Sequence, residues 1–195
     1  ADATLVTTPD LKDFQPQAHH LRFFTPSLAA RARATKTAGR LKIVHATNHP
    51  GIEGTRHIIA AVESLRRKGL DLELIVLTGV TQERVLEELA DADLSIGKMK
   101  MGYYANTQFE SLAVGVPAIT YVRPEFQTQE MLDSGLILST VADLEATIEL
   151  YARDAAALAD KQRKARASVL KLHDNAAIVA ELSAIYDRLR GSSPA

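Results

Sequence analysis

The residue types best suited to chemistry lie between Gly102 and Gly115, where one glutamate sits in a segment bracketed by two glycines. Residues 102–120 have the pattern of a loop, a helix, a glycine turn and a buried strand. A helix placed in this way presents its N-terminal amides at the carboxyl edge of a sheet, where α/β folds bind anions and nucleotides. We therefore expect a binding site around Glu110.

Glu110 would lie about two turns into a helix that opens near Tyr104, so its carboxylate could face a cleft above the sheet. A carboxylate suits a pair of ribose hydroxyls, because it accepts two hydrogen bonds and the sugar donates two. The amides of Asn106 and Thr107, in the first turn, would lack intrahelical partners and could bind a phosphate. From the spacing alone, Glu110 could equally be an ordinary solvent-exposed glutamate on a helix. Free amides occur at the start of every helix, so those of Asn106 and Thr107 do not by themselves indicate a binding site.

A second loop, residues 48–55, joins the first strand of the expected sheet to its helix. Its two glycines, Gly51 and Gly54, would let the backbone approach a ligand, and Thr55 could cap the following helix. By itself the loop is explained as well by an ordinary strand-to-helix connection. Both loops fall on one rim of the sheet, which favours a ligand site.

The elements that position these loops alternate along the chain. The run 72–77 is continuously apolar except for one charge, as expected for a strand covered on both faces, and Thr81 is a plausible helix cap. Strands alternating with helices at this spacing predict an α/β fold, a Rossmann-like doubly wound parallel sheet. The expected strands are residues 41–46, 72–77, 93–96, 117–122 and 136–139.

The flanks of this core have a different character. Residues 1–40 contain too few predicted helices and strands for an independent domain. We interpret them as the end of a preceding domain and an interdomain linker. Residues 41–190 form the predicted domain, which closes with extra helices after Val141 that include a capping Asp174. Residues 191–195 are expected to be a frayed tail. The first residue is alanine rather than methionine, which suggests a piece of a longer protein or, equally, an engineered start.

The composition narrows the function classes. The 195 residues carry 23 basic and 24 acidic side chains, a formal net charge of −1, so we expect no nucleic-acid partner. The lack of cysteine excludes disulfides and thiolate chemistry and fits a reducing compartment. The six histidines lack metal-site spacing, so we expect no metal. Serine-hydrolase, P-loop and dinucleotide-binding motifs are also missing.

The segment from Gly102 to Ile119 resembles the donor-site segment of retaining GT-B glycosyltransferases of the group 1 type, in which a glutamate precedes a Gly-x-Pro-hydrophobic ending. The stretch from His45 to Leu65 is similar to the first strand and helix of the same domain. Leu77 to Val80 resembles its next strand end. The resemblance covers roughly residues 40–190 and identifies the chain as the C-terminal, nucleotide-sugar-binding half of that fold.

The resemblance implies a role for each motif. Glu110 would bind the donor ribose, and the amides near Asn106 and Thr107 the diphosphate or sugar. Gly54 and Thr55 would approach the pyrophosphate, and Gly79 the nucleobase. The remaining residues expected on the donor side are Asn48, Gly102 and Tyr103.

One residue departs from the family pattern. The family usually has a lysine before the Gly-Thr pair, whereas this chain has Glu53. A carboxylate there would repel a diphosphate and weaken donor binding, unless Arg56, His57 or Lys98 supplies the missing positive charge.

The implied activity is transfer of a sugar from a nucleoside-diphosphate sugar to an acceptor, without a cofactor or a protein-bound metal. The implied partners are the nucleotide sugar and an N-terminal acceptor domain, so we expect the chain alone to bind nucleotide weakly and transfer nothing. A cytoplasmic location is expected, with peripheral association at the inner membrane surface left open. Two alternatives stay open: a non-catalytic nucleotide-binding or interaction module of GT-B ancestry, and a sugar-nucleotide epimerase of the same fold.

Overall fold

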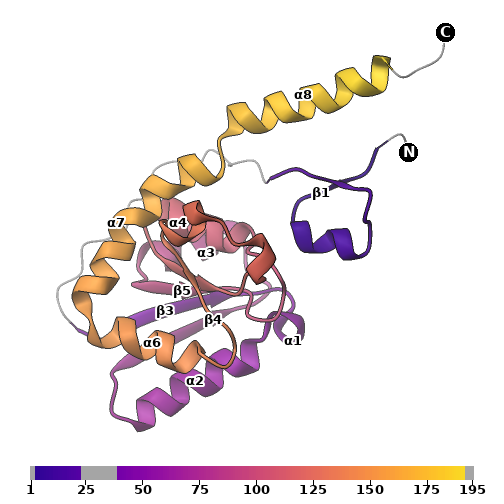
Figure 1. Cartoon of the computed structure of the whole chain (residues 1–195). Helices are drawn as coiled ribbons and strands as arrows, with labels where there is room; N and C mark the ends of the chain where they lie inside the picture. The colour runs from indigo at the N-terminus through magenta and orange to yellow at the C-terminus, as the bar shows by residue number, and fades with distance from the viewer. Residues whose placement is uncertain (1–2, 23–38, 192–195) are drawn as a thin grey trace.

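A computed structural model of the chain describes residues 3–22 and 39–191 and centres on a five-stranded parallel sheet (Figure 1). Every neighbouring pair in the sheet is parallel, and the strand order is β4-β3-β5-β6-β7. The strands are β3 (Leu41–Ala46), β4 (Leu72–Leu77), β5 (Leu94–Ile96), β6 (Ala118–Thr120) and β7 (Leu136–Leu138). The predicted fold class and the five predicted strands are confirmed, with the last three strands shorter than expected.

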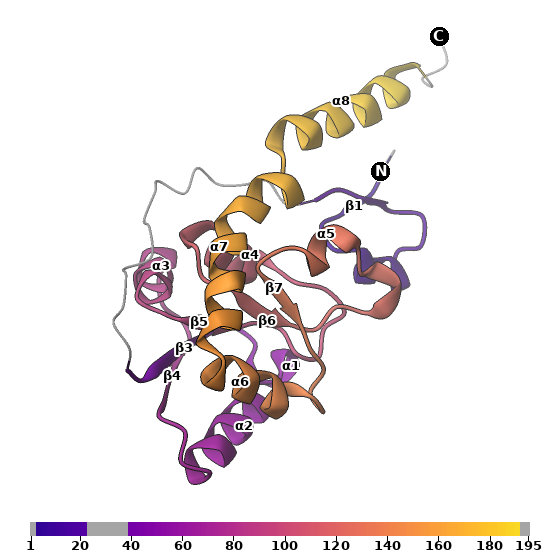
Figure 2. The ribbon, with the colours of Figure 1, turned by 60° about the vertical axis from the view of Figure 1, so that its left-hand side comes forward.

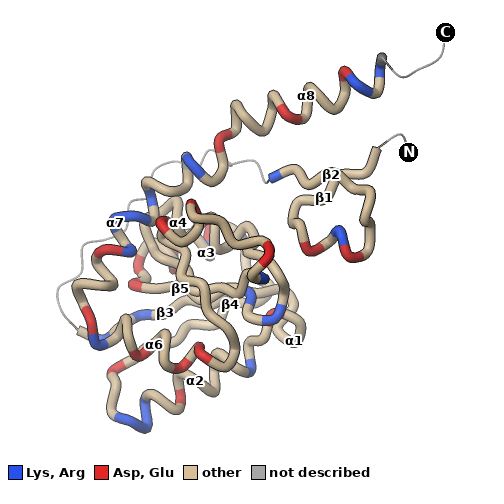
Figure 3. The backbone as a smooth tube through the Cα atoms, in the orientation of Figure 1, with Lys and Arg blue, Asp and Glu red and all other residues tan. Residues whose placement is uncertain are grey.

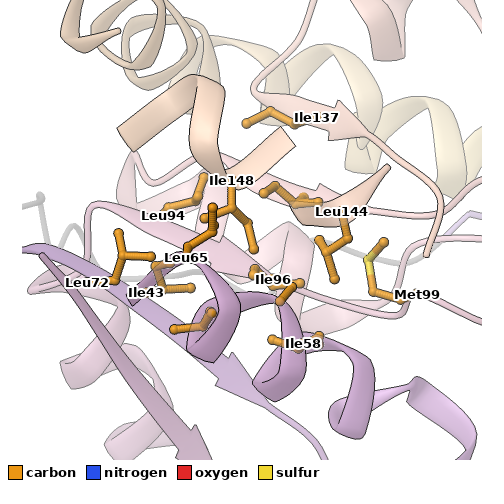
Figure 4. Close-up of a cluster of buried hydrophobic side chains, with 13 residues drawn as sticks. Ile43, Ile58, Leu65, Leu72, Leu94, Ile96, Met99, Ile137, Leu144 and Ile148 are labelled. Carbon is orange, nitrogen blue, oxygen red and sulfur yellow. The ribbon is translucent and has the colours of Figure 1, made fainter. Parts of the chain in front are cut away.

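Helices cover both faces of the sheet. On one face, α2 (Thr55–Arg67) packs beside α6 (Leu144–Arg153), and their apolar side chains meet Ile43, Leu94 and Ile96 (Figure 4). On the other face lie α3 (Gln82–Ala90), α4 (Asn106–Val114) and α7 (Ala155–Leu172), and Figure 2 shows α7 alongside the sheet. Side chains of one strand alternate between these two cores, because Ile43 joins the first and Val44 the second. This two-sided covering explains why the strands are almost continuously apolar.

The helix that carries Glu110 starts later than the sequence predicted. Tyr103 and Tyr104 are buried with their rings stacked 4.5 Å apart, so the chain is still extended at Ala105, whose φ is −135° and ψ −171°. The helix α4 begins at Asn106, and Glu110 is its fifth residue, just over one turn in rather than two. Packing of two aromatic rings thus overrides the local helical pattern.

The loop after β3 is also more ordered than predicted. Residues 50–53 form a helical turn, α1 (Pro50–Glu53), which begins with a proline and ends at Gly54 with φ of 92°. Gly54, rather than Thr55, occupies the N-cap position of α2, and no side chain caps that helix. The predicted capping role of Thr55 is therefore wrong, because its hydroxyl is committed to a buried contact described below.

The N-terminal segment, residues 3–22, pairs β1 (Leu5–Val6) with β2 (His19–His20) around the short 3-10 helix η1 (Pro9–Asp13). The final helix, α8 (Asn175–Gly191), extends away from the sheet in both ribbon views (Figures 1 and 2). Residues 1–2 and 23–38 of the predicted domain end and linker, and residues 192–195 of the predicted tail, lie outside the described residues.

Two short elements complete the described fold: the 3-10 helix η2 (Pro124–Phe126) and α5 (Gln129–Leu132), both between β6 and β7. Lysine and arginine are interspersed with aspartate and glutamate along the described chain (Figure 3). None of the helices in the described ranges is both long enough and apolar enough to pass through a bilayer.

Candidate functional site

The sheet order creates a crevice at the carboxyl ends of β3 and β5. Strand β3 has β4 on one side and β5 on the other, so the chain leaves β3 toward one edge of the sheet and later returns to its opposite side. In doubly wound sheets ligands bind outside the carboxyl ends of the strands at such a reversal. A cavity of about 510 Å³ lies at this position. Its lining residues are Thr7, Thr8, Leu11, Ala46, Thr47, Asn48, His49, Glu53, Leu77, Gly79, Val80, Gln82, Val85, Lys98, Met101, Ala105, Asn106, Thr107 and Glu110.

Glu110 is a cavity residue and not a solvated surface glutamate. Only 7% of its surface is exposed, and the side-chain amide of Gln82 donates a hydrogen bond to Glu110 Oε1 at 2.5 Å. Burial raises the pKa of the Glu110 carboxyl, and the Gln82 hydrogen bond lowers it in part. The carboxylate is thus shielded from bulk water but still reached from the cavity, as a binding group for hydroxyl donors should be.

The first turn of α4 opens into the same cavity. Asn106 and Thr107 are its first two residues, and both line the cavity. The amide of the preceding Ala105 donates to Gln108 Oε1 at 2.8 Å, while no acceptor faces the amides of Asn106 and Thr107 within the described residues. These two amides and the positive end of the helix dipole can bind an anion.

The loop after β3 supplies the opposite wall. Asn48 and His49 are exposed at the cavity, and the amide of His49 donates to Thr47 Oγ1 at 3.1 Å. Glu53 also lines the cavity although only 8% of it is exposed, and its backbone carbonyl accepts from the amide of Met99 at 2.9 Å. No described residue forms a hydrogen bond or an ion pair with the Glu53 carboxylate, which leaves it available to a ligand.

Gly54 and Thr55 support the cavity from behind and do not line it. Thr55 Oγ1 lies 2.8 Å from Nε2 of the fully buried His45, whose Nδ1 lies 2.8 Å from the carbonyl oxygen of Ile96. A carbonyl can only accept, so Nδ1 carries the proton and Nε2 accepts from the threonine hydroxyl. Burial lowers the pKa of His45, in keeping with a neutral ring. Gly54 has a positive φ, and a Cβ there would lie 3.2 Å from Lys100 Cγ.

Gly102 and Tyr103 likewise stand outside the cavity lining. Tyr103 is buried against Tyr104, and a Cβ on Gly102 would clash with Arg123 Nε. Of the residues expected on the donor side, the structure thus brings together Asn48, Gly79, Asn106, Thr107 and Glu110. The other four shape the loops behind them.

Part of the cavity wall has no signal in the sequence. Thr7, Thr8 and Leu11 come from the N-terminal segment, which an arginine ties to the sheet domain: Arg123 Nη2 lies 2.6 Å from Asp13 Oδ2. The ion pair joins residues 110 positions apart. Gln82 was also missed, although its place directly after the predicted cap Thr81, beside the Gly79 strand end, could have drawn attention to it.

The charges around the cavity are mixed. Lys98 lines the cavity together with two glutamates, Glu53 and Glu110. Arg56 and His57 do not line it, and Arg56 Nε lies 3.2 Å from His57 Nε2. Among the described residues that line the cavity, Lys98 is therefore the basic side chain that can pair with an anionic ligand. Residues 3–22 and 39–191 contain no cluster of three or more metal-ligating histidine, aspartate or glutamate side chains.

The sheet order and the helices on both of its faces define a Rossmann-like α/β domain, and solved structures with the same fold include glycosyltransferases. TarM of S. aureus, solved in complex with UDP, matches with a TM-score of 0.73 and 11% identity over 95% of this chain and 44% of its own. Sucrose-phosphate synthase of Thermosynechococcus elongatus gives 0.71 and 15% identity, covering 99% and 59%. Anabaena HepE, in complex with UDP and glucose, gives 0.69 and 11% identity, covering 96% and 63%.

No protein-family model and no curated protein matches the sequence. At these identities the structural likeness establishes the fold, which is that of the C-terminal domain of GT-B glycosyltransferases, as the sequence motifs indicated. The chain spans less than two thirds of the length of each of these three proteins.

Proposed function

We propose that this chain is the donor-binding half of a retaining glycosyltransferase, which moves a sugar from a nucleoside-diphosphate sugar to an acceptor. The observation that carries the proposal is Glu110, a buried carboxylate that lines the cavity at the reversal point of the sheet. The proposal is supported by the fold shared with HepE and TarM, both solved with UDP.

The lining residues suggest how a nucleotide would lie. Glu110 accepts hydrogen bonds from the ribose hydroxyls, and the base extends toward Gly79 at the end of β4. The diphosphate then reaches the amides of Asn106 and Thr107 at the start of α4, with Lys98 beside it. This orientation directs the sugar toward Asn48 on the facing loop.

The chemistry that such a site supplies is stabilisation of the departing diphosphate. Negative charge develops on the leaving phosphate, and the amides of α4 and the ammonium of Lys98 are fixed groups that stabilise it. In the proposal neither a cofactor nor a protein-bound metal takes part, and the acceptor is held by an N-terminal domain. The chain by itself therefore binds nucleotide and transfers no sugar.

Isothermal titration with UDP, GDP and ADP and their sugars tests the proposal. The variant Glu110→Ala should lose about 1.5–3 kcal/mol of binding free energy, the scale of hydrogen bonds to a charged group. The matched control is Glu63→Ala, which removes an exposed glutamate from α2. Equal affinities of wild type and Glu110→Ala would remove Glu110 from the site, and sugar transfer by the chain alone would contradict the half-enzyme assignment.

A second candidate function is favoured by Glu53. An unpartnered carboxylate in the cavity repels a diphosphate, and this is what a non-catalytic module of the same ancestry would tolerate. The same titration separates the two functions. Binding of a nucleotide sugar supports the donor-binding half, whereas no heat with any nucleotide supports an interaction module.

A further inference from the structure

The contact between Gln82 and Glu110 joins two helices that follow different strands of the sheet, α3 after β4 and α4 after β5. Gln82 is the first residue of α3 and Glu110 the fifth of α4, and the two helices pack against each other. The start of α3 is fixed by Thr81, whose side-chain oxygen accepts from the amide of Arg84 at 3.3 Å. The backbone thus holds Gln82 in position at the cavity wall.

The hydrogen bond divides the two oxygens of Glu110 between protein and ligand. A carboxylate can only accept, so the Gln82 amide nitrogen is the donor to Oε1 at 2.5 Å. Glu110 Oε2 has no hydrogen-bond partner in the part of the chain that the structure describes, while the residue lines the cavity. One oxygen is therefore anchored, and the other is left for a donor that enters the cavity.

We propose that Gln82 is a positioning residue that aims the Glu110 carboxylate at the ribose hydroxyls and so makes the site selective for ribonucleotides over 2′-deoxyribonucleotides. The inference rests on the proposed function, because it assigns a ribose to Glu110. Gln82 limits the rotation of the carboxylate before the ligand arrives, so less conformational freedom is lost on binding.

Gln82 also acts on the charge of Glu110. Burial raises the pKa of this carboxyl, and the amide donor opposes that shift. The other titratable or charged groups on the cavity wall are Glu53, His49 and Lys98, and on α3 the Arg84 guanidinium is engaged by Glu87 and Glu88. Without Gln82 the carboxyl would hold its proton to higher pH, and a protonated carboxyl offers fewer acceptor sites to the ribose hydroxyls.

The test compares Gln82→Met with Gln129→Met. Methionine keeps the length of the side chain and removes the amide. Gln129 is a matched control, because it is the first residue of α5, its amide donates to Asp133 Oδ2 at 3.1 Å, and it lies outside the cavity lining. We expect Gln82→Met to weaken binding of the ribonucleotide about tenfold, to weaken the 2′-deoxyribonucleotide less because it keeps only one of the two hydroxyls, and to shift the acid limb of binding to higher pH. Gln129→Met should change none of these.

One further measurement, read together with the binding comparison, distinguishes failure of the Gln82 role from failure of the proposed function. Carbon-13 NMR of the Glu110 carboxyl follows its titration without any ligand, and Gln82→Met should raise that pKa while Gln82→Lys, which restores a donor, should lower it again. If wild type binds ribonucleotide and discriminates against the deoxy form but Gln82→Met does so equally, Gln82 is not the positioning residue and the proposed function stands. If wild type binds no nucleotide, both the proposed function and the ribose selectivity are wrong. If Gln82→Met leaves the NMR titration of Glu110 unchanged, Gln82 does not lower the pKa of that carboxyl.

Discussion

Replacing Thr55 by valine removes one hydroxyl from a buried hydrogen-bond chain and nearly preserves side-chain volume. The chain runs from Thr55 Oγ1 to His45 Nε2 and from His45 Nδ1 to the carbonyl of Ile96, with both links 2.8 Å long. His45 is fully buried, so the variant leaves its Nε2 acceptor without a partner and without water. An orphaned buried acceptor costs about 1–3 kcal/mol of folding free energy.

Urea unfolding followed by far-ultraviolet circular dichroism measures this cost, since the chain has no tryptophan. The control is Thr78→Val, at an exposed position outside the cavity lining, which should change stability by no more than about 0.5 kcal/mol. Thr55→Val should keep the slope of the denaturant dependence and lower the midpoint. A Thr55→Val protein as stable as wild type would show that the threonine hydroxyl does not satisfy His45.

Two further predictions concern the pH dependence of stability, through His45, and the affinity for UDP, through Glu53. His45 has a lowered pKa in the folded chain, so the unfolded chain binds its proton first as the pH falls; the stability it contributes is present above its unfolded pKa of about 6.5 and is lost below it. Unfolding free energy measured between pH 7.5 and 5 should therefore fall, less steeply in His45→Gln, and parallel curves would argue against the buried histidine as a cause. Glu53→Lys should strengthen UDP binding at least about tenfold by replacing repulsion with attraction, and an unchanged dissociation constant in calorimetry would place the diphosphate away from Glu53.

Periodicity and turn residues were enough to predict the sheet. The strand β3 was predicted residue for residue, and the Thr81 cap of α3 was placed correctly, because both depend on local backbone and burial patterns. The start of α4 was misplaced because Tyr103 and Tyr104 pack into the core, which a local pattern does not reveal.

The candidate site could also be predicted only in part from the sequence. Residues at strand ends and helix starts, such as Asn48, Gly79 and Asn106, could be placed at one rim from topology. The pairing of Gln82 with Glu110 depends on how two helices pack, and the contribution of residues 3–22 depends on a contact between distant parts of the chain. Neither is encoded in spacing along the sequence.

The Arg123–Asp13 ion pair makes the cavity a composite of two stretches of chain. Arg123 reaches Asp13 at 2.6 Å and stacks over Phe126 at 5.1 Å, so the same side chain braces the segment that carries Thr8 and the loop after β6. A ligand that touches both stretches gains free energy from the docked segment, and by reciprocity it stabilises the docking by the same amount. The occupancy of the site and the attachment of residues 3–22 are in this sense one coupled equilibrium.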